Sequence, residues 1–414
     1  MQSRISNSGV YYGWFVVGAC FLGSLVVFGI SYSFGVFFDH MLVEFGRSRG
    51  ETSLVFGIQT FVMYVGAAVI GGFIDRYGTR PSLLGAMGLL GIGFGGVTMS
   101  TSFTQIILFY SIIASLGLSV VYVVSFATVP RWFKRRRGFA GGIASSGTGV
   151  GMLFATPAAS ALIVAVGWRS TYALFLLAAL ALLAIAFLVI ADSPRRLDVN
   201  ISREFSNAPE FESQKTSWRT QLSETVAVAR TPSFLLVFFG WVCIYATLYI
   251  VFANLVIYTA DTGMGRSVGV WALGLIGGAT SLARLGIGLV SDKLGRTRVF
   301  VVCSGVMGLS TFMLAMINSA AAVFIFAIIY GAAYGGNGAL LSPLTADLFG
   351  AKNINVIFGL ISVSFAISGL LAPPLAGLIY DAFASYVPAF VAAGLIGVLG
   401  AGMVALGGDI APSQ

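Results

Sequence analysis

About twelve long apolar stretches dominate this sequence of 414 residues and limit what it can fold into. A transmembrane helix needs about 20 mainly apolar residues, and each stretch reaches or approaches that length. Only 9% of the residues are charged, against about 25% in a soluble domain. We therefore predict an all-α membrane protein with twelve transmembrane helices. Their expected positions are 10–38, 53–74, 81–100, 103–130, 138–166, 168–191, 232–260, 267–291, 299–317, 320–349, 354–380 and 386–407.

The chain is basic, with 23 Lys and Arg against 15 Asp and Glu. Most of the basic residues fall in alternate segments between the predicted spans, and cytoplasmic segments of membrane proteins carry such an excess. The charge therefore indicates topology rather than a nucleic-acid partner, and both termini are predicted to be cytoplasmic. The first apolar stretch is too long for a signal-peptide core. We expect it to remain as a span of a protein in the cell membrane.

One long polar interruption, at 192–230, divides the chain into six predicted spans before it and six after it. Its Asp, Glu, Ser, Asn, Gln and Pro residues are typical of a connector rather than of a packed domain. We predict three parts: an N-terminal six-helix bundle at 1–191, a cytoplasmic linker at 192–230 and a C-terminal six-helix bundle at 231–414.

The two bundles carry related sequences. Residues 71–80 read GGFIDRYGTR and residues 288–297 read GLVSDKLGRT, so that Asp75 corresponds to Asp292 and Arg76 to Lys293. Internal repeats are typical of secondary transporters, in which one repeat moves against the other around a central site. The duplication therefore predicts a transporter of two pseudo-symmetric halves.

Arg284 is the one charged residue that falls deep inside a predicted span, and no acid lies near it along the stretch from Ser267 to Ser291. An arginine stays protonated in a protein, and burial in a bilayer costs at least a few kcal/mol. A planar guanidinium holds a carboxylate with two charge-assisted hydrogen bonds. We interpret Arg284 as the binding residue for an anionic substrate. The alternative is a structural arginine that pairs with an acid elsewhere in the bundle.

Three motifs resemble a known family. The Gly-x-x-x-Asp-Arg/Lys-x-Gly cluster that begins at Gly71 and recurs at Gly288 resembles the signature loop of the major facilitator superfamily. The segment Arg131–Gly147, RWFKRRRGFAGGIASSG, and the start of the first span, Tyr11-Tyr12-Gly13-Trp14, resemble signatures of its monocarboxylate transporters. This branch also contains oxalate–formate exchangers. Arg284 falls where the substrate-binding arginine of the family lies.

The resemblance implies a conformational gate of charge pairs between helices at the cytoplasmic ends. The residues that match it are Asp75, Arg76, Arg80, Asp292, Lys293 and Arg296. This sequence also departs from the family. Thr280 stands one turn before Arg284, where many relatives have the aspartate to which proton transfer is attributed, and Tyr32 is nearest to the position of their first-helix lysine. Which group would carry a coupled proton is therefore open.

Polar and aromatic residues of the central spans complete the candidate substrate site. Tyrosine hydroxyls could share a carboxylate, and a phenyl ring could cover an aliphatic tail. Taken singly, each is more often a packing residue than a contact. The candidates beside Arg284 are Tyr32, Tyr122, Tyr334, Asn337, Ser364, Phe365 and Thr280.

The leading hypothesis is a secondary transporter of a small monocarboxylate such as lactate or pyruvate, coupled to protons and working by alternating access. The alternatives are an oxalate–formate-like carboxylate exchanger and a carboxylate sensor that does not transport. An enzyme would need a nucleophile, a metal cluster or an acid pair within the membrane, and the predicted spans offer none. We expect no cofactor and no metal, the bilayer as surroundings, and an oligomeric state that the sequence leaves open although a monomer would suffice.

Overall fold

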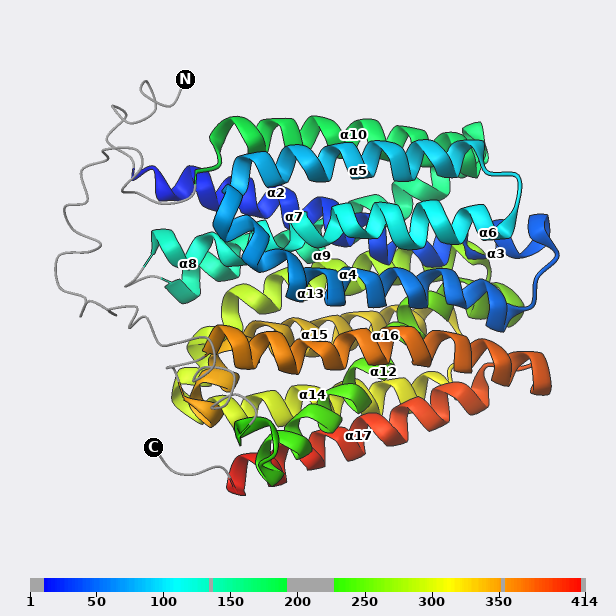
Figure 1. Ribbon diagram of the computed structural model, residues 1–414. Coiled ribbons are helices and arrows are strands. Elements are labelled where there is room, and N and C mark those ends of the chain that lie inside the picture. The colour runs from blue at the N-terminus through cyan, green and yellow to red at the C-terminus, as the bar shows by residue number, and fades with distance from the viewer. Residues whose placement is uncertain (1–10, 134–136, 192–226, 351–353, 411–414) are drawn as a thin grey trace.

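The computed structural model describes residues 11–133, 137–191, 227–350 and 354–410. Its helices include twelve that are long and apolar enough to cross a membrane, as predicted from the sequence. The helices before and after the 192–230 segment lie in two groups (Figure 1), here called the N-terminal and C-terminal halves. Residues 192–226 of the predicted 192–230 linker lie outside the described residues.

The N-terminal half contains the first six spans, of which the first and the fourth are each built from more than one helical segment. Its elements are α2 (Gly13–Tyr32), α3 (Phe34–Phe45), α4 (Arg49–Tyr77), α5 (Thr79–Met99), α6 (Phe103–Ile106), the π-helix η1 (Ile107–Ala114), α7 (Ser115–Ala127), α8 (Val129–Trp132), α9 (Arg137–Val166) and α10 (Trp168–Val189).

The C-terminal half contributes one helix to each of its six spans. These helices are α12 (Pro232–Asp261), α13 (Arg266–Leu294), α14 (Arg296–Leu314), α15 (Ala320–Phe349), α16 (Ile354–Phe383) and α17 (Val387–Ile410).

The first span extends beyond its predicted end near residue 38. The helix is interrupted at Ser33, resumes as α3 and ends at Gly46, which adopts the left-handed conformation with φ 58°. The second span begins at Arg49 rather than near 53, because Ser48 and Glu51 form a capping box at the start of α4. Local capping therefore sets these boundaries rather than the loss of apolar character.

The two halves meet mainly through two pairs of helices, α4 against α16 and α9 against α13. Glycines allow the backbones to approach closely. A Cβ added at Gly149 of α9 would lie only 2.1 Å from the carbonyl oxygen of Gly277 in α13, and one at Gly57 of α4 only 2.9 Å from that of Leu370 in α16. Small residues serve the same purpose at helix interfaces in other membrane proteins.

Among the described residues, the interface between the halves is tightly packed toward one end and looser toward the other. We call the end at which α2 begins and α17 ends the terminal end, and the opposite one the distal end (Figure 1). Gly71 follows Gly57 on the same face of α4, and Gly138 precedes Gly149 on the same face of α9, each closer to the terminal end. An added Cβ at either of these two meets no atom within 4 Å. The halves therefore separate toward the terminal end.

Candidate functional site

Arg284 lies on α13 at the level where the two halves begin to separate. It is 8% exposed. Its Nη1 donates to the carbonyl oxygen of Ser145 at 2.8 Å and to Oγ1 of Thr148 at 3.2 Å, and both acceptors belong to α9 of the other half. The buried Nε has no hydrogen-bond partner in the described part of the chain. The guanidinium is thus held on one side by neutral groups and keeps an unused donor.

The described carboxylates that form ion pairs do so with other cations, near the helix ends. Asp39 pairs with Arg266, Glu44 with Arg169, Glu51 with Arg47, Asp261 with Arg49 and Asp347 with Arg296. Within the described residues no ion pair involves Arg284. Among the described residues, this permanent cation in the interior has no carboxylate to neutralise it.

Tyr334 of α15 lies beside Arg284 and connects it to the N-terminal half. The Cζ atom of Arg284 is 5.6 Å from the centre of the Tyr334 ring, which is within the range of a cation–π contact. The hydroxyl of Tyr334 lies 3.2 Å from that of Tyr32 at the end of α2. Two of the predicted site residues therefore join the halves next to the guanidinium.

Aromatic side chains extend the site across the interface. Tyr122 of α7 packs against Tyr64 of α4 with ring centres 5.5 Å apart, and Tyr64 in turn packs against Phe365 of α16 at 5.2 Å. Tyr245 of α12 meets the edge of Phe365 at 4.4 Å. The predicted residues Tyr122 and Phe365 thus belong to one cluster, together with Tyr64 and Tyr245, which were not predicted from the sequence.

Three further candidates are placed differently. The amide of Asn337 is bonded within the C-terminal half, since Nδ2 donates to Oγ of Ser304 at 2.6 Å and Oδ1 accepts from the Tyr245 hydroxyl. The Thr280 hydroxyl donates to the carbonyl of Gly331 at 3.0 Å and so joins α13 to α15. Ser364 is fully buried, and its Oγ has no partner among the described residues.

The groups that hold Arg284 were not predicted from the sequence. Ser145 lies in the segment that resembles a family signature, but its backbone carbonyl, not its side chain, accepts the hydrogen bond. No residue-type pattern reports such a contact. Tyr64 and Tyr245 could have been noticed as tyrosines within long apolar stretches, where a hydroxyl needs a partner.

The predicted gate residues lie at the terminal end. Arg80 donates to the carbonyls of Ile190 and Leu188 at 2.9 and 3.2 Å, within its own half. Arg296 pairs with Asp347 at 2.9 Å, also within its own half. Arg76 lies over the ring of Tyr77, and Lys293 is exposed. The side chains of Asp75 and Asp292 fall outside the described residues.

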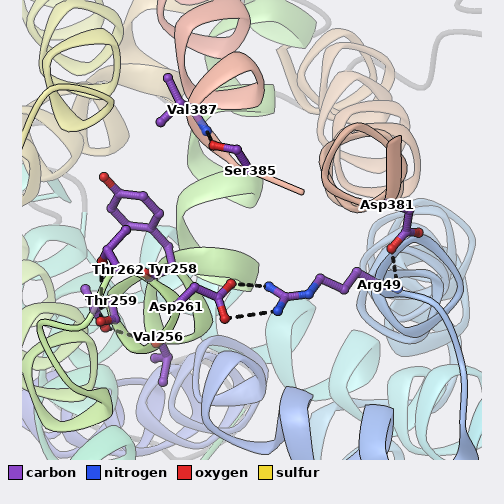
Figure 2. Close-up of polar contacts among 9 residues, drawn as sticks. All are labelled: Arg49, Val256, Tyr258, Thr259, Asp261, Thr262, Asp381, Ser385 and Val387. Atoms are coloured by element: carbon purple, nitrogen blue, oxygen red, sulfur yellow. Dashed lines mark hydrogen bonds and ion pairs between the residues drawn. The ribbon is translucent and has the colours of Figure 1, made fainter. Parts of the chain in front are cut away.

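Charged groups join the halves at the distal end. Figure 2 shows Arg49 of α4 reaching the carboxylate of Asp261 at the end of α12, with Nη2 3.0 Å from Oδ1. Asp381 at the end of α16 accepts from the backbone N–H groups of Arg49 and Gly50 at 3.1 and 3.0 Å. The Arg49 guanidinium also lies 3.6 Å from the centre of the Tyr380 ring. We call Arg49, Asp261 and Asp381 the distal latch.

The chain matches the family model of the Major Facilitator Superfamily over residues 20–286 and 249–412. It is 26% identical over 375 residues to MFS transporter asaE of Aspergillus flavus, covering 88% of this chain and 79% of that protein. It is 24% identical over 419 residues to human monocarboxylate transporter 2, covering 96% and 86%.

The fold is also similar to that of a solved structure. A bacterial homologue of the human lysosomal transporter Spinster, in an inward-facing and unoccupied conformation, superimposes with a TM-score of 0.70. The match covers 96% of both chains at 13% sequence identity. At that identity the similarity concerns the arrangement of the helices alone.

Proposed function

Because the chain belongs to the Major Facilitator Superfamily and is a membrane transporter rather than an enzyme, we propose that its substrate is a small monocarboxylate of the lactate or pyruvate type. We further propose that it carries this anion by alternating access and together with a proton. The similarity to monocarboxylate transporters over nearly the whole chain supports the substrate class.

A single observation carries the proposal, namely the buried guanidinium of Arg284 between the halves with an unused Nε. A carboxylate would neutralise this cation and accept charge-assisted hydrogen bonds from it. The aromatic cluster of Tyr32, Tyr122, Tyr334 and Phe365 would surround the rest of a small substrate. The described residues place no second cation beside Arg284, which favours a monoanion over a dianion such as oxalate.

Alternating access requires one gate at each end of the molecule. The distal latch closes the distal end in this structure. In the opposite conformation, we propose that charges at the terminal end close that side, with Asp75, Arg76, Arg80, Asp292, Lys293 and Arg296 forming pairs between helices. Breaking several partly desolvated pairs supplies a switch of a few kcal/mol, the scale of a two-state equilibrium.

The test is uptake of radiolabelled lactate into proteoliposomes, with and without an imposed pH gradient, by the wild type and by Arg284→Ala. We expect an inside-alkaline gradient to stimulate wild-type uptake. We expect Arg284→Ala to weaken lactate binding about 100-fold or more, because two charge-assisted hydrogen bonds are lost.

Each outcome separates the alternatives. Uptake by Arg284→Ala at the wild-type rate would refute the binding role. Wild-type uptake that needs internal carboxylate and ignores the pH gradient would indicate an exchanger. Binding without accumulation would indicate a sensor.

A further inference from the structure

Among the described residues, the hydrogen bonds of Arg284 leave one edge of its guanidinium without a partner. Both bonds to α9 are made by Nη1, while Nε is buried without a partner among the described residues. Nε and Nη2 form the side edge of a guanidinium, whose two N–H groups match the two oxygens of a carboxylate. Any bidentate ligand that leaves the bonds to α9 intact must use this edge.

Gly338 of α15 lies directly against that edge. A Cβ added there would be 2.8 Å from Nη2, 3.4 Å from Cζ and 3.6 Å from Nε of Arg284. Gly338 follows Tyr334 by four residues, so the two share a helix face. The ring of Tyr334 and the bare backbone of Gly338 therefore flank the same guanidinium.

Gly338 differs from the neighbouring glycines of α15 in the atoms that an added Cβ would meet. A Cβ at Gly331 would lie 2.4 Å from the carbonyl oxygen of Ile276, and one at Gly335 2.5 Å from that of Thr280, so these two allow α15 to approach α13. At Gly338 the three nearest atoms all belong to the guanidinium of Arg284. Close packing of backbones therefore accounts for Gly331 and Gly335 but not for Gly338.

We propose that Gly338 is a positioning residue: it puts no side chain against the buried Nε–Nη2 edge of Arg284, so that a carboxylate that displaces the packing there docks side-on while Ser145 and Thr148 hold Nη1. The proposal rests on the proposed function and specifies how the substrate is held. A methyl group at position 338 would compete with the carboxylate for this edge or displace the guanidinium by tenths of an ångström. It would weaken every carboxylate, whatever its tail.

The test compares Gly338→Ala with the wild type, Arg284→Ala and the control Gly286→Ala in the purified full-length protein. An added Cβ at Gly286 on α13, two residues from Arg284, meets no atom within 4 Å. Binding of radiolabelled acetate and lactate is measured by equilibrium dialysis, and folding by the thermal unfolding midpoint. We expect Gly338→Ala to lose about tenfold or more in affinity for both anions, the loss of one charge-assisted hydrogen bond. Gly286→Ala should bind as the wild type does.

The outcomes distinguish this inference from the proposed function. If Arg284→Ala loses binding and folded Gly338→Ala binds as the wild type does, side-on docking past Gly338 is wrong and the role of Arg284 stands. If the wild type binds neither anion, or Arg284→Ala binds equally well, both proposals fall. If Gly338→Ala does not fold, Arg284→Lys replaces it, because lysine keeps the charge but lacks the edge. Wild-type affinity in that variant would overturn side-on docking.

Discussion

At the scale of single residues, Arg284 of α13 is stabilised by neutral groups from two other helices. A carbonyl and a hydroxyl of α9 accept from Nη1, and the face of Tyr334 on α15 lies near the positive charge. Neutral acceptors lower the cost of burying a cation without cancelling its charge. A carboxylate can therefore still bind with a gain in Coulomb energy, which an internal aspartate or glutamate partner would have removed.

The Asn337 side chain is fully buried and is bonded within the C-terminal half. Replacing it with leucine removes the hydrogen bonds to Ser304 and Tyr245 and leaves two buried hydroxyl groups without that partner. We expect Asn337→Leu to lower the free energy of unfolding by about 2–3 kcal/mol. The measurement is denaturant unfolding of the purified protein in detergent.

Asn254 provides the matched comparison, because among the described residues its Nδ2 donates only to the carbonyl oxygen of Ile250 in its own helix. Asn254→Leu should cost less than Asn337→Leu. Equal stability losses in the two variants would contradict the assignment of Asn337 as a bridge between α12, α14 and α15.

At the scale of helices, charge and backbone capping combine at the distal latch. The start of α4 is capped by its own Ser48–Glu51 box and by Asp381 of α16. Carboxylates are favoured at a helix N-terminus, where unpaired N–H groups and the positive end of the helix dipole lie. Three helices, α4, α12 and α16, are thus joined across the halves at one point (Figure 2).

Breaking the distal latch should shift the molecule toward opening at that end. The Arg49 and Asp261 side chains are 15% and 28% exposed, so we expect Arg49→Ala to favour opening by about 1–2 kcal/mol, between the values for exposed and buried pairs. Double electron–electron resonance between spin labels at Val43 and Ala382, in a background without native cysteines, reports the separation of the halves.

The control for this experiment is Arg47→Ala. Arg47 pairs with Glu51 near the start of α4, and both residues belong to the N-terminal half. The distance distribution of the Arg47→Ala variant should match that of the wild type. The same distribution in Arg49→Ala would show that the latch does not hold the distal end closed.

The terminal-end gate gives a separate prediction. We expect Asp75→Ala to slow lactate transport in proteoliposomes while leaving lactate affinity nearly unchanged, because the proposed role of Asp75 is to stabilise one conformation and not to touch the substrate. Transport at the wild-type rate would remove Asp75 from the gate, and a large loss of affinity would place it in the binding site.

At the scale of the whole molecule, an even number of spans brings the start of α2 and the end of α17 to the same end of the bundle (Figure 1). The asymmetry of Lys and Arg predicts that this end faces the cytoplasm. An impermeant thiol reagent applied to intact cells should therefore label a cysteine introduced at Ala382 near the distal end. It should not label one introduced at the exposed Asp409 near the terminal end. The reverse pattern would invert the topology.

The sequence by itself determined the positions of the spans, the internal repeat and the placement of a single arginine within an apolar stretch. The spans follow from the length of the apolar stretches, because every backbone polar group in a bilayer must be bonded within its own helix. The repeat of Asp75-Arg76 as Asp292-Lys293 indicated a two-fold architecture. The position of Arg284 in a stretch without acids, Ser267–Ser291, followed from the order of residues alone.

Only the tertiary structure decided which helix faces meet. A membrane helix is apolar both toward lipid and toward its neighbours, so its pattern does not fix its rotation about its own axis. The contacts of Arg284 with Ser145 and Thr148, the latch of Arg49 with Asp261, and the bonding of Asn337 all join residues of different helices. These pairings depend on which helix faces pack together. The sequence of a single apolar stretch does not specify that.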